Sequence, residues 1–546
     1  MDDCLNYEQT QRFSNLILDY INQKSSLSSF YHRFPDSQNF KSQILEKQAQ
    51  YNNEHRAVLV DVLNRQYQGF KVSDSTQNHI DALHQENTFT ITTGHQLNLF
   101  TGPLYTFYKI ITVLKTCEQM KSRYPQYNFV PIFWLASEDH DFEEINHFYF
   151  ETQKIKWSKK ASGAVGELET DGLKSVLEIF DKALPQTESA NQLKGLFREA
   201  YLNHKSLSQA SIYLYNNLFG SKGLVVLEPN QKPLKSCFKH QIKAELLQQT
   251  TFKKVNLTSK ALKAKNYHEQ VTPREINLFY KDKNLRERLI LKNGTYFVNS
   301  TQLAFSKEEI LKEVKNNPEK FSPNALMRPL YQEVLLPNLS YVGGAGELAY
   351  WLQLKSTFNS FDVPFPLLQM RNSALLLSGK TKGKLERLNL DINDLFQSKI
   401  ELKNQQTRKI SEIDIDFSSQ KTHLSKQFEA LYKIAEQTDK SFLNAVAAQE
   451  QKQHNGLDKL EKRLLKAQRR KLADEIDRSV RLQDKLFPKG QLQERIINFS
   501  ELYLTYGKQF ISLLYTEFEP LEFKFSIIKL ETKLSSINHK LVSNCI

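Results

Sequence analysis

The first two thirds of the chain alternate between short apolar runs and amphipathic stretches, the pattern typical of strands and helices in turn. Residues 88–93 are rich in β-branched and aromatic side chains and predict a strand, and residues 129–136 predict a second, buried strand. Between them, residues 103–120 are apolar on nearly every side except for a polar stripe that includes Lys109. This predicts a buried helix that begins at Pro103. A strand, a helix and a strand within about 50 residues predict a βαβ unit with parallel strands.

Later apolar runs extend this parallel sheet. Residues 224–228, 339–342 and 364–370 each predict one further buried strand. The segments near 150–215 and 255–320 mix helical and strand-like patterns, so we expect them to be insertions that connect the strands of one core. The fold class that these patterns predict is α/β with a parallel sheet.

The pattern changes at about residue 378. From there to residue 486, glycine and proline almost vanish and apolar positions recur at spacings of three and four, which predicts two long antiparallel helices joined near residues 439–444. A final helix and a short strand at 522–529 are expected to return to the body. We therefore divide the chain into a core of residues 1–373 and a C-terminal coiled-coil domain of residues 374–546, whose tail packs back on the core.

The net charge bears on the possible binding partners, and the cysteine content bears on possible zinc sites and disulfides. The net charge of +13 over 546 residues permits attraction to anionic partners. Acidic residues are interspersed with basic ones along the predicted coiled coil, however, so we expect no nucleic-acid partner. The four cysteines are far apart and form no CxxC pair, which argues against a zinc ribbon or a disulfide framework. The polar N-terminus and the lack of a long apolar run lead us to expect a cytoplasmic protein without a membrane contact.

The most conspicuous polar cluster follows directly on the predicted strand at 129–136. Its four side chains are Glu138, Asp139, His140 and Asp141, and we take them as the candidate catalytic residues. They could bind a divalent metal, with His147 as a further ligand, or act as acid–base groups. The alternative is a helix N-cap cluster, since Asp141 with Glu144 three residues on resembles a capping box. Spacing alone leaves these possibilities open.

A second polar loop follows the strand at 88–93 and contains Gly94, His95 and Gln96. Ligands of parallel sheets bind beyond the carboxyl ends of the strands, so this loop and the 138–141 cluster should converge there. His95 occupies the position at which class I aminoacyl-tRNA synthetases carry an ATP-binding histidine, but their second, lysine-rich signature is not evident. Lys109 is either a snorkelling side chain or a phosphate contact.

A glycine-rich turn precedes the last predicted helix of the core and contains Gly343, Gly344 and Gly346, with Glu347 next to them. It lacks the spacing of a dinucleotide fingerprint and the Lys-Ser or Lys-Thr of a P-loop. Glycines at such a turn allow a ligand to approach the backbone, where free N–H groups could bind an anion. A dense set of polar and aromatic residues flanks it, which we take as candidate substrate- or nucleotide-binding residues: Arg328, Gln332, Glu333, Tyr350 and Trp351.

Five segments together resemble one family, the cysteine ligases of bacillithiol biosynthesis known as BshC. They read TGHQLNLFTGPLYTFYKI, PIFWLASEDHDFEEINH, VTPREINLFY, NALMRPLYQEVLLPNLSYVGGAGELAYWLQLK and FPKGQLQERIINF. The resemblance implies a Rossmann-like core with inserted connecting segments and a coiled-coil domain through which two subunits pair as a homodimer. It also implies the last step of bacillithiol assembly, in which cysteine joins the free amine of glucosaminyl-malate, with ATP as the activating agent.

The resemblance also suggests roles for the candidate residues. Lys109, Arg274 and Arg328 would balance phosphate or malate carboxylates. One departure from the family pattern concerns the loop after the first strand, where the family commonly has glutamine at the position of His95. This favours Gln96 as the shared contact. Two other functions stay open, a nucleic-acid-binding protein with a synthetase-like core and a non-catalytic dimeric scaffold of the same pathway.

Overall fold

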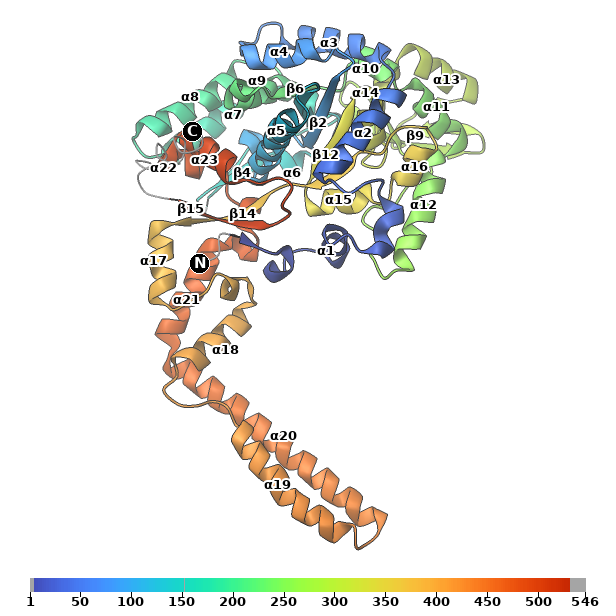
Figure 1. The fold of residues 1–546 in the computed structure, drawn as a ribbon. Helices are drawn as coiled ribbons and strands as arrows, with labels where there is room; N and C mark the ends of the chain where they lie inside the picture. Colours follow the sequence, from blue (N-terminus) through green and yellow to red (C-terminus); the bar gives the residue numbers. More distant parts are fainter. Residues whose placement is uncertain (1–3, 152, 531–546) are drawn as a thin grey trace.

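The computed structural model describes residues 4–151 and 153–530, and its centre is a five-stranded sheet (Figure 1). All neighbouring strands in this sheet are parallel, in the order β13-β12-β2-β3-β6. The α/β class and the five core strands predicted from the sequence are therefore confirmed. The strands are β2 (Thr88–His95), β3 (Asn128–Leu135), β6 (Val225–Leu227), β12 (Asn338–Gly343) and β13 (Leu367–Met370).

The crossover helix α5 (Tyr105–Arg123) packs against β2 and β3 and is buried along most of its length. It begins two residues later than the sequence predicted, because Pro103 forms an isolated β-bridge with Asn498 instead. The Asn498 side chain also donates to the carbonyl oxygens of Phe100 and Gly102. A segment near the C-terminus thus fixes the loop that leads into α5.

Two insertions connect the core strands, as predicted. The first contains the hairpin β4 (His147–Phe150) and β5 (Gln153–Lys156), followed by α7 (Leu173–Ala183), α8 (Glu188–Leu202) and α9 (Leu207–Phe219). The second contains α12 (Thr250–Lys263) and a five-stranded antiparallel sheet of order β10-β9-β8-β7-β11. Its strands are β7 (Leu278–Asp282), β8 (Leu285–Lys292), β9 (Thr295–Val298), β10 (Ala304–Phe305) and β11 (Phe321–Pro323). Between the insertions lie two helices, α10 (Lys232–Ser236) and α11 (Lys239–Gln248).

The chain leaves the central sheet after β13 and enters a second sheet that joins its two ends. In this sheet β14 (Ser373–Ser378) pairs in parallel with β15 (Phe525–Leu530), which pairs antiparallel with β1 (Cys4–Leu5). The predicted tail strand at 522–529 is therefore confirmed with a small shift. The division of the chain at residue 373 stays a prediction, and residues 531–546 lie outside the described part of the chain.

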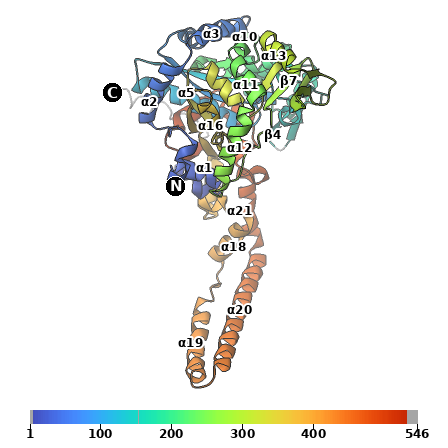
Figure 2. The same ribbon diagram turned by 90° about the vertical axis from the view of Figure 1, so that its right-hand side faces the viewer.

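The coiled-coil arm is a helical hairpin that projects from the body (Figures 1 and 2). Its helices α19 (Ser418–Ala435) and α20 (Lys440–Lys471) stand on a base formed by α18 (Lys399–Ile410) and α21 (Ala473–Leu486). The range predicted as two long helices thus contains five, these four and α17 (Gly379–Arg387). The hairpin turn lies slightly before the predicted 439–444, because Asp439 caps α20 by accepting from the N–H groups of Ser441 and Phe442.

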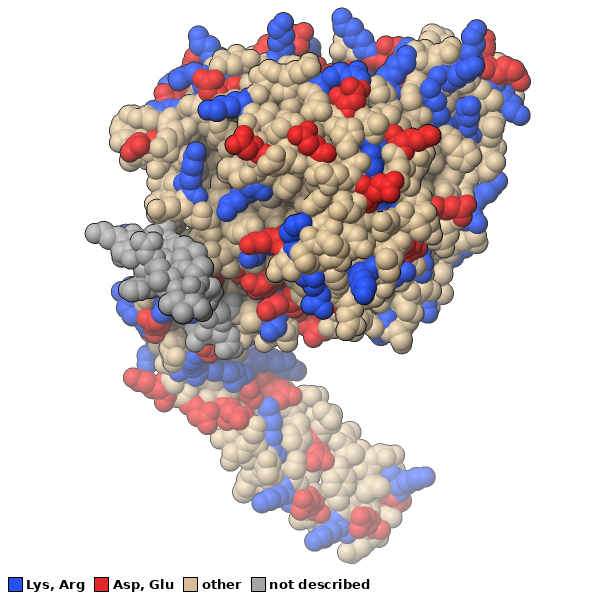
Figure 3. All heavy atoms as spheres, turned by 45° about the horizontal axis from the view of Figure 1, so that its top comes forward, with Lys and Arg blue, Asp and Glu red and all other residues tan. Residues whose placement is uncertain are grey.

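Basic and acidic side chains are interspersed over the face shown in Figure 3 and along the arm. In the arm, Lys421 pairs with Asp458 and Glu461, and Arg408 also pairs with Glu461. The basic residues of the arm thus have acidic neighbours rather than forming a stripe of one charge. In the described ranges, every helix is too short or too polar to cross a membrane. The cytoplasmic location stays a prediction.

Candidate functional site

The loops after β2, β3 and β12 meet at the carboxyl edge of the central sheet. The Gln96 side chain joins the first two, because its Nε2 donates to Asp139 Oδ2 at 2.8 Å and to Glu144 Oε2 at 2.7 Å. Lys109 joins the first and third, because its Nζ donates to the Gly94 carbonyl oxygen at 2.8 Å and lies 2.6 Å from Glu347 Oε2. The predicted convergence of these loops is confirmed. We call the residues gathered here the strand-end cluster: Gly94, His95, Gln96, Tyr105, Lys109, Asp139, Arg328, Gly344, Glu347, Tyr350, Arg371 and Arg495.

Lys109 and Glu347 form the buried ion pair of the strand-end cluster. Lys109 is only 2% exposed, so it does not snorkel to solvent. Burial raises the pKa of Glu347, but the charge of Lys109 outweighs it and holds the pKa at about 2, so Glu347 is a carboxylate at neutral pH. Glu347 also accepts from the Tyr341 hydroxyl and from the Gly344 N–H at 2.8 Å. That N–H is therefore already bonded, which corrects the expectation that Gly344 offers it to an anion.

Three arginines bring positive charge to the strand-end cluster. Arg328 begins α14 (Arg328–Leu335) and donates only to neutral groups, Gln332 Oε1 at 3.1 Å and the Tyr350 hydroxyl at 3.3 Å. Within the described residues it forms no ion pair. Arg371 follows β13, and its Nη2 lies 2.5 Å from Glu494 Oε1. The guanidinium carbons of Arg371 and Arg495 lie 5.3 and 5.9 Å from the centre of the Tyr105 ring.

Arg371 and Arg495 were missed from the sequence. The signal for Arg371 was its place directly after the last core strand, which is the carboxyl edge where ligands bind. Arg495 stands in the motif FPKGQLQERIINF, which carried part of the family resemblance although its place in the fold could not be foreseen. The C-terminal part of the chain thus contributes directly to the site.

Two buried polar atoms in the strand-end cluster have no hydrogen-bond partner among the described residues, His95 Nε2 and Arg371 Nε. Burial, together with the nearby positive charge of Lys109, lowers the pKa of His95 to about 3, so the imidazole is neutral at physiological pH. Buried polar groups normally have partners. Both of these atoms belong to residues that lie against the Tyr105 ring, so we take them as an indication of where a ligand binds. The ligand that fits is an anion with oxygen acceptors.

The four candidate catalytic side chains at 138–141 diverge. Glu138 pairs with the buried Lys235 at 2.6 Å, Asp139 faces Gln96, and His140 Nδ1 accepts from Arg286 Nη1 at 2.6 Å. Asp141 caps α6 (Phe142–Ile145) by accepting from the Glu144 N–H, which supports the N-cap interpretation for this residue.

This divergence does not fit a metal site. His147, the further ligand considered above, lies beside Asn146 rather than with the four. Throughout the described part of the chain, no three His, Cys, Asp or Glu side chains are grouped so that they could hold a metal ion.

Asp139 is held as a carboxylate by its neighbours. Burial raises the pKa of Asp139, but hydrogen bonds from His140 and Gln96 and the charge of Arg286 outweigh it and hold the pKa well below its usual range. Asp139 is therefore a persistent carboxylate that orients Gln96. Because arginine can only donate, His140 Nδ1 is the acceptor in its contact with Arg286.

The remaining predicted site residues lie outside the strand-end cluster. Glu333 pairs with the fully buried Lys47 and accepts from the side chains of Gln332 and Asn338. Trp351 stacks on the Tyr341 ring, with ring centres 4.4 Å apart. Arg274 is exposed in the second insertion. Gly343 is close-packed in β12 and Gly346 is open to solvent.

Comparison with protein families gives two matches that together span nearly the whole chain. Residues 2–372 match the N-terminal Rossmann-like domain of bacillithiol biosynthesis BshC, and residues 374–530 match the C-terminal coiled-coil domain of the same family. The five motifs described above all lie within these two matches.

Individual relatives agree with the family match. Three similar curated proteins carry the name "Putative cysteine ligase BshC". That of Flavobacterium johnsoniae is 51% identical over 526 residues, which cover 96% of this chain and 99% of the relative. That of Christiangramia forsetii is 50% identical and covers 96% and 98%, and that of Flavobacterium psychrophilum is 51% identical and covers 96% and 99%.

Proposed function

This chain belongs to the BshC family of bacillithiol biosynthesis, and from that premise we propose that it is an ATP-dependent ligase. In this proposal it forms the amide bond between the carboxyl group of cysteine and the free amine of glucosaminyl-malate. Both substrates and ATP carry carboxylate or phosphate groups. A site for them needs cations that are not already neutralised by the protein.

The observation that carries the proposal is the state of the cations in the strand-end cluster. Arg328 has only neutral partners among the described residues, and Arg371 Nε and His95 Nε2 are both buried without a partner there. Arginine binds carboxylate and phosphate oxygens through two parallel hydrogen bonds, which suits both kinds of anion. The position at the carboxyl edge, between β2 and β12 where the strand order reverses, is the usual ligand site of such sheets.

Two routes of carboxylate activation fit this chemistry. In the first, a cysteine carboxylate oxygen attacks the α-phosphorus of ATP and pyrophosphate leaves, giving a cysteinyl adenylate. In the second, it attacks the γ-phosphorus and ADP leaves, giving an acyl phosphate. In either route the neutral amine of glucosaminyl-malate then attacks the acyl carbon, AMP or phosphate leaves with the bonding electrons, and the amine loses a proton. The cationic residues would stabilise the charge that develops on the phosphate oxygens.

The test is an assay of the purified full-length chain with cysteine, glucosaminyl-malate and ATP. We expect bacillithiol to form in equal amount to the ATP consumed, and the pair of products, AMP with pyrophosphate or ADP with phosphate, identifies the route. A chain that consumes no ATP and forms no bacillithiol would contradict the proposal. Tight binding of RNA that weakens steeply with salt would instead favour the nucleic-acid-binding alternative.

A pair of glycine substitutions probes the ligand space without removing any charge. A Cβ on Gly344 would lie 3.5 Å from Glu347 Oε2 and 3.6 Å from Arg371 Nε, and the backbone there suits any residue. Gly344→Ala should therefore fold but place a methyl group close to the unpartnered Nε of Arg371. We expect kcat/KM to fall by about 10–100-fold, the cost of displacing a bound group by about 1 Å.

The matched control is Gly346→Ala, since a Cβ there meets nothing within 4 Å. It should keep full activity and lose no thermal stability, because alanine favours a helix over glycine. Equal activity of the two variants would show that no reacting group lies between Arg371 and Glu347.

The proposal includes pairing of two chains through the coiled-coil arm. Three large apolar side chains of the α19–α20 hairpin are about half exposed, Ile434 at 56% and Phe442 at 47% near its tip and Leu460 at 53% farther along α20. Such a face on a projecting hairpin is typical of a helix–helix contact. Leu460→Asp should therefore give monomers in sedimentation velocity at micromolar concentration, whereas Asn455→Asp, which adds the same charge to the same helix, should leave dimers. Monomers of the unaltered chain would contradict this.

A further inference from the structure

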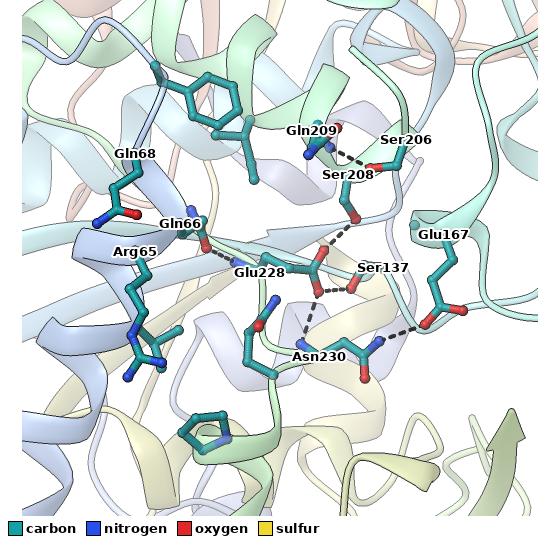
Figure 4. Close-up of a pocket in the computed structure, with 16 residues that line it drawn as sticks. Arg65, Gln66, Gln68, Ser137, Glu167, Ser206, Ser208, Gln209, Glu228 and Asn230 are labelled. Atoms are coloured by element: carbon teal, nitrogen blue, oxygen red, sulfur yellow. Dashed lines mark hydrogen bonds between the residues drawn. The ribbon is translucent and has the colours of Figure 1, made fainter. Parts of the chain in front are cut away.

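A separate cavity of about 640 Å³ opens at the carboxyl ends of β3 and β6, beside the strand-end cluster (Figure 4). This volume lies in the range of small-molecule sites, about 300–1,000 Å³. Its floor is formed by Ser137, Ser208, Glu228 and Asn230, and Gln66 flanks it from α3 (Glu54–Tyr67). The proposed reaction as described so far uses none of these residues.

The centre of the floor is the carboxylate of Glu228, which the fold has buried after β6. Figure 4 shows Ser137 and Ser208 turned toward it, and both hydroxyls donate to its oxygens. The Asn230 N–H donates to Oε1 at 3.0 Å. Burying a carboxylate is costly unless it is hydrogen-bonded in this way. The chain thus maintains a buried acidic group that faces a cavity.

The hydrogen-bond donors of these floor side chains are engaged with other protein groups, whereas acceptor atoms remain free to bind a ligand. Gln66 Nε2 donates to the Val226 carbonyl oxygen, and Asn230 Nδ2 donates to Glu167 Oε1. The two serine hydroxyls are committed to Glu228, so toward the cavity they present only lone pairs. Asn230 Oδ1 is buried and accepts from no described residue. A ligand that satisfies this floor must carry several O–H or N–H donors.

The charge of the floor selects among such ligands. Glu228 is acidic, the other acid of the lining, Glu167, is paired with Lys281, and the one basic side chain in the lining, Arg65, is exposed and paired with Asp61 on its own helix. Phosphate and carboxylate groups are therefore disfavoured here, in contrast to the strand-end cluster with its free cations. A polyhydroxylated compound with an amino group fits both the donor requirement and the charge.

The cavity is close enough to the strand-end cluster for one substrate to reach both. His95 pairs in register with Leu135, and Leu227, next to Glu228, pairs with Trp134. The two sites are thus separated by two strand spacings, about 10 Å. Residues 137–139 form the wall between them, since Ser137 faces the cavity, Glu138 pairs with Lys235 and Asp139 faces Gln96.

We propose that this cavity binds the amino-sugar ring of the acceptor substrate, with Glu228, Ser137, Ser208 and Asn230 accepting from its hydroxyl and amino groups. The malate carboxylates of the same molecule then extend toward the cations of the strand-end cluster. This assignment rests on the proposed function, because it takes glucosaminyl-malate as the acceptor. It divides recognition of one molecule between an acceptor-rich site and a cationic site.

Direct binding tests the cavity without the reaction. The full-length chain is titrated with D-glucosamine, D-glucose and L-malate in a calorimeter or by saturation-transfer NMR. We expect D-glucosamine to bind about tenfold more tightly than D-glucose, the effect of one added charged hydrogen bond. Glu228→Gln should abolish this preference, and Ser208→Ala should weaken binding of both sugars. Gln192→Ala, in a different cavity beside α8, is the control and should change neither.

Kinetics then separate the cavity from the proposed function. In the ligase assay, Ser208→Ala and Glu228→Gln should raise the KM for glucosaminyl-malate about tenfold while the KM values for ATP and cysteine stay unchanged. An active ligase whose KM for glucosaminyl-malate is unaffected by both variants would overturn the cavity assignment and leave the function standing. A chain that binds D-glucosamine through Glu228 and Ser208 but makes no bacillithiol would contradict the proposed function and leave sugar binding in the cavity standing.

Discussion

Replacement of Lys47 by methionine is expected to lower the free energy of unfolding by about 3–5 kcal/mol, the usual cost of removing one partner from a buried ion pair. Lys47 and Glu333 are both fully buried, with Nζ and Oε2 3.2 Å apart. Methionine fills much of the same volume, so the loss comes mainly from the carboxylate left behind. Chemical denaturation followed by circular dichroism measures it.

The size of this loss depends on pH. Burial already raises the pKa of Glu333 above its ordinary value, and the charge of Lys47 opposes that rise. Without Lys47 the pKa in the folded state rises further, so folding favours the protonated acid. A group with a raised folded-state pKa stabilises the fold at low pH and loses that contribution as the pH rises through the pKa. The stability difference between Lys47→Met and the unaltered chain should therefore grow from pH 5 to pH 8.

The double variant Lys47→Met with Glu333→Gln is the control, because it removes the orphaned charge together with its partner. It should recover most of the lost stability, since the amide keeps hydrogen-bond contacts to Gln332 and Asn338. If the double variant were as unstable as the single one, packing of the Lys47 stem rather than the carboxylate would be responsible. Either way, Glu333 is placed in the interior of the core and not against a ligand.

Arg328→Met is expected to have the largest effect on activity, a fall in kcat/KM of about 10²–10³-fold, comparable to the loss of a group that stabilises transition-state charge. Arg328 lies beside Tyr341 and Tyr350 in the strand-end cluster and has no acidic partner among the residues described. Its charge is therefore available to a bound phosphate or carboxylate. Its removal leaves no carboxylate orphaned, so the thermal midpoint should change little.

Two further substitutions complete this test. Arg328→Lys keeps the charge but loses the planar pair of donors, so it should recover only part of the activity. Arg123→Met, an exposed arginine stacked on Tyr124 at the end of α5, should leave the activity unchanged. Steady-state kinetics of all three variants measure these changes in kcat/KM. Full activity of Arg328→Met would remove this residue from the anion site.

Among the predicted site residues, those that lie together share one property: they stand at the ends of core strands or on the helix that crosses between them. Gly94, His95 and Gln96 follow β2, Asp139 follows β3, and Glu347 follows β12. The rule that ligands lie beyond the carboxyl ends of parallel strands was sufficient to bring these segments together. It could not tell that Glu138 and His140 would turn aside to Lys235 and Arg286, because Lys235 comes from α10 and Arg286 from the second insertion, both distant in the chain.

The sequence by itself determined the parallel core, the helical arm and the family, because each depends on local hydrophobic periodicity or on motifs that are continuous in the chain. Only the tertiary structure decided which charges are free. Lys109 pairs with Glu347, Lys47 with Glu333 and Arg371 with Glu494. Each of these ion pairs joins segments more than a hundred residues apart. Arg328 is left without such a partner in the described ranges. The tertiary structure alone also decided the cavity at Glu228, because its floor is assembled from four separate elements. The hydrogen-bond donors of that floor are engaged in contacts that no local sequence pattern predicts.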